Sequence, residues 1–250
     1  MAGHSKWAQI KRKKGATDAK RGQLFSKLAR AIIVAAREGG PDPAGNLALQ
    51  NAIEKAKEAS MPKDNIERAI ARGAGPSADG VAYETVTYEG YGPAGIAVYV
   101  EAVTDNRNRT AAEVRHIFSK ADGSLGESGS VAWLFERRAV VLVDGSADED
   151  ELTLAAAEGG ADDVERDGDS WRITAPPESL SSVREAVEAA GMTAESAELT
   201  MLPKTTVELE DESAARKVLR LMDALEENDD VQDVYANFDV PGRVLETVEG

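Results

Sequence analysis

The sequence lacks cysteine and contains only two histidines, His4 and His116. The absence of cysteine excludes disulfides, thiolate metal sites and cysteine nucleophiles. Neither histidine has a second metal ligand four residues away, or a Ser and Asp pattern suited to nucleophilic catalysis. The sequence therefore predicts a protein that is not an enzyme, holds no metal, and needs neither a cofactor nor a small-molecule substrate.

Long hydrophobic runs are also missing. The longest, AIIVAA at 31–36, is far too short to span a bilayer. The basic N-terminus never develops the apolar core and small-residue cleavage site of a secretory signal. With 42% hydrophobic residues, the 250-residue chain can still fill more than one core. We therefore expect a folded cytoplasmic protein with no membrane partner.

Positive charge is scarce and concentrated at one end of the chain. The formal net charge is −16, yet residues 1–37 contain ten Lys or Arg and a single acid, Asp18. The net charge is +8 over 1–72, −3 over 73–138 and −21 over 139–250. This asymmetry indicates an interaction surface for a negatively charged partner at the basic end. The alternative is that the basic segment docks on the acidic part of the same molecule.

The first region combines a basic arm at 1–16, which lacks apolar periodicity and is expected to be flexible, with a helical domain at 17–79. Apolar spacing, N-caps and Gly or Pro stops predict helices over 17–39 and 46–59, and a third that starts at Pro62 and ends before Gly73. The basic residues of the first helix are expected on its outer face: Lys20, Arg21, Lys27, Arg30 and Arg37.

The second region begins as paired strands. Residues 83–88 and 96–103 are rich in β-branched and aromatic residues and flank the turn sequence EGYGPAG. Thr110 and Glu113 form a capping box that predicts a helix start at Thr110. Further on, SVAWLF alternates as a strand does, with Val131, Trp133 and Phe135 on one face.

The third region, 139–204, shows the order β-α-β-β-α-β of a ferredoxin-like sandwich. Residues 205–250 add strands and one strong helix that lack a core of their own. We therefore predict that they return to the middle region, giving a discontinuous domain of 80–138 and 205–250. The fold class is α+β: an N-terminal helical domain and two α/β sandwich domains, the last ferredoxin-like and inserted into the middle one.

Two segments are candidate binding sites. In DNRNRT (105–110), Arg107 and Arg109 stand ahead of a helix N-terminus, which favours a bound anion such as phosphate. The alternative is that Asp105 or acids elsewhere neutralise these arginines. In the arm, Trp7 lies among five Lys or Arg and either packs on the helical domain or stacks on a base between phosphate contacts.

Five stretches resemble, in order, the YebC/PmpR family of bacterial regulatory proteins: GHSKWAQIKRKK, DAKRGQLFSKLAR, YEGYGPAG, DNRNRTAAEVRHIFSK and GSVAWLF. Mitochondrial relatives of that family are translational activators of cytochrome c oxidase. The family usually has Asn where Gln9 stands and Gly where Asp122 stands. By matching position, the resemblance implies that nucleic acid is contacted by ten residues: His4, Lys6, Trp7, Lys11, Arg12, Lys13, Lys14, Lys20, Arg21 and Lys27.

The resemblance implies three domains and a role as a DNA-binding transcriptional regulator. Its alternative is a ribosome-associated translation factor that contacts ribosomal RNA and relieves stalled synthesis. The sequence shows no helix-turn-helix signal in the first two helices, and a basic arm with one aromatic residue suits irregular RNA as well as duplex DNA. A third hypothesis, a ligand sensor built on the ferredoxin-like region, rests on fold analogy alone.

Overall fold

The computed structural model describes residues 18–75, 83–241 and 243–244. Its contacts divide the chain into two compact units. The first unit contains the described residues before Phe135 and after Lys204, and the second is Phe135–Lys204. Buried apolar residues form three clusters, one in the helices before residue 76, one in the rest of the first unit and one in the second unit. The three-domain division stays a prediction.

The first unit begins with the helices α2 (Asp18–Gly39), α3 (Leu47–Glu58) and α4 (Lys63–Ala74), with a short 3₁₀ turn at Pro43–Gly45. Asn46 caps α3, because its side chain accepts from the Leu49 amide at 3.1 Å. The sequence prediction is confirmed for these helices, except that α4 continues through Gly73. At that point α2 and α4 touch: a Cβ on Gly73 would lie 2.5 Å from the Ile33 carbonyl oxygen.

The rest of the first unit is an α/β fold. Before the second unit it contains β1 (Glu84–Tyr91), β2 (Ala97–Thr104), α5 (Arg107–Lys120) and β3 (Ser124–Leu125), with a 3₁₀ turn at Pro93–Gly95. After it come β8 (Val207–Glu208), α8 (Glu212–Glu226), β9 (Val231–Ala236) and β10 (Phe238–Asp239). The sheet order is β3-β1-β2-β9, and β8 pairs with β10. Because β9 is antiparallel to β2, the return of the C-terminal segment to this sheet is confirmed.

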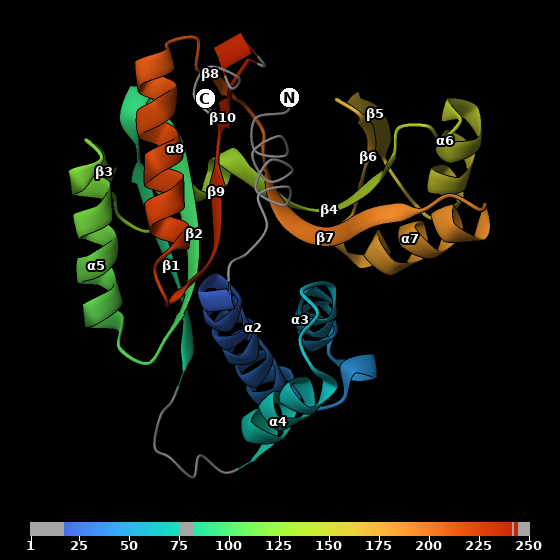
Figure 1. Ribbon diagram of the computed structural model, residues 1–250, viewed down its shortest axis with the longest axis horizontal. Coiled ribbons are helices and arrows are strands. Elements are labelled where there is room, and N and C mark those ends of the chain that lie inside the picture. Colours follow the sequence, from blue (N-terminus) through green and yellow to red (C-terminus); the bar gives the residue numbers. More distant parts are fainter. Residues whose placement is uncertain (1–17, 76–82, 242, 245–250) are drawn as a thin grey trace. The chain divides into compact units, whose positions relative to one another are not determined.

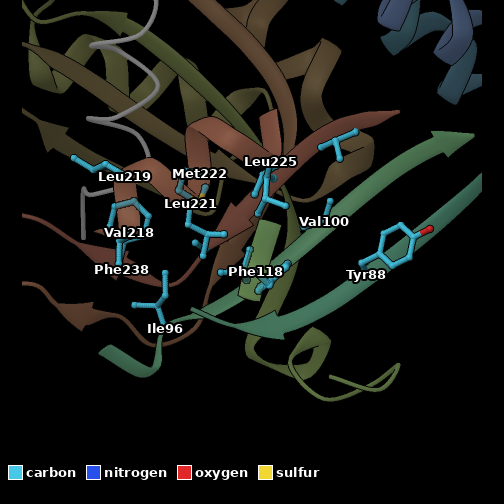
Figure 2. Packing of buried hydrophobic residues seen from close by; sticks show 14 of the residues in the cluster. Tyr88, Ile96, Val100, Phe118, Val218, Leu219, Leu221, Met222, Leu225 and Phe238 are labelled. Atoms are coloured by element: carbon cyan, nitrogen blue, oxygen red, sulfur yellow. The ribbon is translucent and has the colours of Figure 1, made fainter. Parts of the chain in front are cut away.

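The core of this fold lies between the sheet and two helices. Figure 1 shows α5 and α8 beside each other against β1, β2 and β9. Leu221, Met222 and Leu225 of α8 are fully buried, as are Phe118 of α5 and Val100 of β2 (Figure 2). Burial of each such side chain stabilises the fold by about 1.5–3 kcal/mol. The spacing of apolar residues along α8 therefore fixes which of its faces meets the sheet.

The segment before Phe135 is a 3₁₀ turn, η3 (Ala132–Leu134), and the prediction of a strand across SVAWLF is wrong. The buried carboxylate of Glu89 accepts from the Val131 and Ala132 amides, each at 2.7 Å. Burial alone would raise the pKa of Glu89, but these amides and that of Gly129 lower it below its ordinary value. The amides that would pair with a neighbouring strand therefore donate their hydrogen bonds to Glu89, a residue distant in sequence.

The second unit contains β4 (Phe135–Asp144), α6 (Glu149–Glu158), β5 (Asp163–Asp167), β6 (Ser170–Ala175), α7 (Leu180–Ala189) and β7 (Ala194–Pro203), with a 3₁₀ turn at Pro177–Ser179. All three strand pairs are antiparallel in the order β5-β6-β4-β7, as the ferredoxin-like prediction requires. Asp148 caps α6, so the acidic run around it begins a helix. The predicted α+β fold class is confirmed.

The described helices include none that is both long and apolar enough to cross a membrane.

Gly73→Ala tests the close approach of α2 and α4. In a helix interior this change normally stabilises by about 0.5–1 kcal/mol. Here the added methyl meets the Ile33 carbonyl and the Ala36 side chain, so we expect a loss of about 1–3 kcal/mol in the free energy of unfolding, measured with urea. Gly22→Ala is the matched control, because a Cβ on that exposed glycine of α2 meets nothing within 4 Å. Equal stabilisation by both changes would show that the helices separate easily.

Candidate nucleic-acid interface

Most of the predicted contact residues lie outside the described part of the chain: His4, Lys6, Trp7, Lys11, Arg12, Lys13 and Lys14. Lys20 lies in the first turn of α2, but its side chain is also outside the description. Among the described residues, the structure brings together the start of α2, the start of α5 and the segment 226–230, which leads from the last residue of α8 to β9. This junction is the candidate interface.

One face of α2 packs on the segment 226–230 instead of facing solvent. Lys27 is buried, and its Nζ donates to the Glu226 carbonyl at 2.6 Å. Gln23 Nε2 donates to the Glu227 carbonyl at 2.8 Å. The prediction that Lys27 lies on an exposed basic face is therefore wrong, because its ammonium group satisfies a carbonyl at the end of α8. Arg21, at the start of α2, is exposed as expected.

The helix α5 starts three residues earlier than predicted. Asn106 is its N-cap, with its side chain accepting from the Arg109 amide at 3.1 Å. Arg107 and Arg109 therefore lie in the first turn of the helix. Thr110, which was expected to cap the helix, is buried within it. The capping-box prediction is wrong because the Thr110 hydroxyl bonds a buried carboxylate.

That carboxylate belongs to Asp230, which lies just before β9. It accepts from Arg109 Nη2 at 2.7 Å, Thr110 Oγ1 at 2.7 Å and Thr104 Oγ1 at 3.2 Å. Its other oxygen accepts from Arg30 Nη1 of α2 at 2.9 Å. The Asp230 side chain is only 5% exposed, so these donors replace water around its charge. One carboxylate thus joins α2, β2 and α5.

The electrostatics of the junction favour the ionised carboxylate. Burial would raise the pKa of Asp230, but the hydrogen bonds from Arg109 and Thr110, and the charge of Arg109, lower it below its ordinary value. In return, the bonds to Asp230 and Asp105 raise the pKa of Arg109 further above its ordinary value. Asp230 remains ionised and Arg109 charged at neutral pH.

The two arginines of DNRNRT consequently differ in what they can bind. Arg109 is occupied by Asp230 and by Asp105, whose Oδ1 lies 2.9 Å from its Nη2. Arg107 is 64% exposed and has an ion pair with Glu84 of 3.6 Å, also at the surface. Exposed pairs of this kind contribute only about 0–1 kcal/mol, so a phosphate can replace the Glu84 carboxylate. Of these two arginines, Arg107 is the candidate for contact with an anion.

Sequence reasoning missed Asp230. Its only signal in the sequence is an acid placed directly before an apolar strand, within the run ENDDVQDV at 227–234. A run of acids near a helix end normally indicates a solvated loop, and nothing local distinguishes Asp230 from Asp229. The partners that bury it come from residues more than one hundred positions earlier in the chain.

Asp230→Asn tests the junction. The variant leaves Arg30 and Arg109 without their shared charged acceptor, and we expect the free energy of unfolding to fall by about 2–3 kcal/mol in urea at neutral pH. Asp229→Asn is the control: its exposed carboxylate accepts from Gln23 Nε2, and we expect a loss below about 1 kcal/mol.

The pH dependence of the Asp230→Asn effect has a defined sign. Because the folded state lowers the pKa of Asp230, its stabilisation is fully present above the unfolded pKa of about 3.9 and is lost as the pH falls through the lower, folded value. The difference between the wild type and Asp230→Asn should therefore shrink in acid. Equal losses for the two variants, or a difference that grows in acid, would contradict this role.

Comparison with known proteins shows to which family the chain belongs. Residues 5–76 match the family model described as TACO1/YebC protein N-terminal domain, and residues 83–238 match the one described as TACO1/YebC second and third domain.

Relatives match over nearly the full length of the chain. A protein of Rubrobacter xylanophilus, named a probable transcriptional regulatory protein, is 61% identical over 251 residues and covers 100% of both chains. One of Dictyoglomus thermophilum with the same name is 54% identical over 250 residues, which are 99% of this chain and 100% of the relative. The crystal structure of a conserved hypothetical protein from Aquifex aeolicus is 52% identical, covers 90% of this chain and 92% of its own, and has a TM-score of 0.79. The resemblance seen in the sequence motifs is confirmed, and the chain belongs to the TACO1/YebC family.

Proposed function

We propose that this protein is a non-enzymatic regulator of gene expression that acts in the cytoplasm by binding nucleic acid through its basic N-terminal region. The observation that carries this proposal is the charge distribution. Residues 1–72 have a net charge of +8, although the whole chain has −16. Curated relatives are named probable transcriptional regulatory proteins, which supports a regulatory role.

The docked face of α2 has fewer cations for a partner than the sequence predicts. Lys27 and Arg30 are committed to the segment 226–230, so they cannot also bind phosphates without breaking the junction. Arg21 remains exposed at the start of α2, directly after the arm in sequence. The alternative that the basic segment docks on acids of the same molecule thus describes Arg30, which binds Asp230, whereas Lys27 binds a main-chain carbonyl. The cations at 6–14 lie outside the described residues, and they are the contacts that this proposal assigns to a partner.

The start of α5 supplies a second candidate phosphate contact. Arg107 is exposed, and the helix dipole adds partial positive charge at the same end. Contacts of this kind give affinity without sequence preference, because they recognise the phosphate backbone. They suit a protein that positions itself on nucleic acid by charge and leaves sequence recognition to other groups.

The kind of nucleic acid separates two forms of this proposal. A transcriptional regulator would prefer particular duplex DNA sequences, whereas a translation factor would bind ribosomal RNA and sediment with ribosomes. The relatives' names favour the first form. The second form follows from the arm, whose single tryptophan among lysines and arginines suits unpaired RNA.

The replacement of Lys11, Arg12, Lys13 and Lys14 by Ala tests the role of the arm. We expect binding to weaken about equally on all sequences, because the lost contacts are to phosphates. The slope of log K against log salt concentration should flatten by about 3 to 4 units, since each lost contact removes roughly 0.7 to 0.9. Fluorescence anisotropy with labelled DNA and RNA over a salt series measures both quantities.

A matched variant removes four positive charges elsewhere, with Lys120, Lys204, Lys217 and Arg220 replaced by Ala. These residues are all exposed, and the change in net charge is the same. We expect this control to alter the salt slope much less than the arm variant. The proposal is contradicted if both variants change the slope equally, or if the arm variant leaves it unchanged.

A further inference from the structure

A groove lies between α2 and α4, away from the junction with segment 226–230. Its volume is about 320 Å³, at the lower end of the range of ligand pockets. Helix α2 contributes Phe25, Ser26, Ala29 and Ile33, and the segment leading into and along α4 contributes Met61, Asn65, Arg68, Ala69 and Arg72. The hollow is an open site on a helical scaffold.

Small side chains create the groove. Ala29 of α2 and Ala69 of α4 both line it, and neither fills the space between the helices. Ile33 and Ala69 are buried, so they form an apolar floor, while Phe25 and Met61 add larger apolar surface. Without a ligand this apolar floor is in contact with water. Covering it with a flat apolar group removes that surface from water, which favours binding.

The polar groups of the groove are positive or neutral. Arg68 and Arg72 are exposed, and no acidic side chain is among the described residues that line it. Arg68 donates from Nε to the Asp64 carbonyl at 3.1 Å and from Nη2 to Asn65 Oδ1, which fixes its guanidinium beside the groove. The nearby acid Glu67 is paired with Lys63 at 3.5 Å. The groove therefore favours a ligand that combines an apolar face with negative charge.

We propose that the α2–α4 groove binds an unpaired nucleobase, with Arg68 and Arg72 facing the adjoining phosphates. This inference rests on the proposed function and names the class of nucleic acid that it requires: a single strand, or a loop with exposed bases. A base has a flat apolar ring next to an anionic backbone, which matches an apolar floor beside two arginines. In a duplex the bases are stacked and paired, so their faces cannot enter.

The position of the groove in the chain supports a nucleic-acid ligand over an acidic peptide. Phe25 and Ser26 lie on α2 one turn after the exposed Arg21, and the cations at 6–14 precede that helix. Because residues four apart lie on the same side of a helix, Arg21 and Phe25 share one face of α2, so a phosphate on Arg21 adjoins the groove. An acidic peptide would need both carboxylates for the arginines and an apolar side chain for the floor.

The test compares two strands that carry the same number of phosphates. One is an oligothymidylate, and the other is an abasic strand of equal length. We expect the full-length protein to bind the first roughly tenfold more tightly, as measured by fluorescence anisotropy at fixed salt. Ala29→Leu fills the groove without changing any charge, so it should remove this preference and leave the affinity for the abasic strand unchanged.

Ala71→Leu is the matched control, because Ala71 is exposed on α4 and does not line the groove. It should keep the preference for bases. Ser26→Leu, at an exposed position of the groove, provides a second filling variant in case Ala29→Leu fails to fold, which thermal unfolding reports. Agreement of the two filling variants would support the proposal.

Four results would overturn the inference, and they differ in whether the proposed function survives. Equal affinity for both strands, or a preference that survives groove filling, removes the groove but leaves nucleic-acid binding intact. If the wild type binds a peptide of alternating Glu and Leu, and only that binding is lost on filling, the occupant is an acidic peptide. Absence of binding to every strand and to duplex DNA contradicts the proposed function itself.

Discussion

The buried carboxylate of Asp230 is the interaction on which the arrangement of the first unit depends. A charge at a site that is 5% exposed is stable only when hydrogen-bond donors replace its water, and here the donors come from three separate elements. Arg30 brings α2 to the α/β fold, while Arg109 and Thr110 bring the start of α5. The sheet and the helical segment are thereby joined at one ionised group.

This junction also decides which cations remain for a partner. Arg30 and Arg109 bind the Asp230 carboxylate, and Lys27 binds a main-chain carbonyl at the end of α8. Of the other basic residues expected along α2, Arg21 is exposed and Arg37 is half-buried. Of the arginines in DNRNRT, only Arg107 keeps an exposed, weakly paired guanidinium. Among the described cations, Arg68 and Arg72 beside the α2–α4 groove are exposed as well.

Local sequence signals predicted the helices and the ferredoxin-like order of the second unit, because apolar spacing and caps determine those elements. The errors share a different cause: a side chain distant in sequence forms the hydrogen bonds that the local pattern assigns to a strand or a helix cap. Glu89 takes the amides that would have formed a strand at SVAWLF, and Asp230 takes the hydroxyl of Thr110 that would have capped a helix. Gly73 lies inside α4 and does not end it, because only a residue without a side chain leaves room for α2 at that point. Such contacts join residues far apart in sequence, so no local pattern reveals them.

The central claim is that the basic N-terminal region contacts nucleic acid and that the strongly acidic region 139–250 does not. Ultraviolet crosslinking in growing cells, followed by mass spectrometry of the crosslinked peptides and sequencing of the recovered DNA and RNA, tests it directly. The account predicts nucleotide adducts on residues 1–37 and around Arg107, and the recovered sequences identify promoter DNA or ribosomal RNA as the target. Adducts confined to residues 139–204, or no adducts anywhere in the chain, would contradict it.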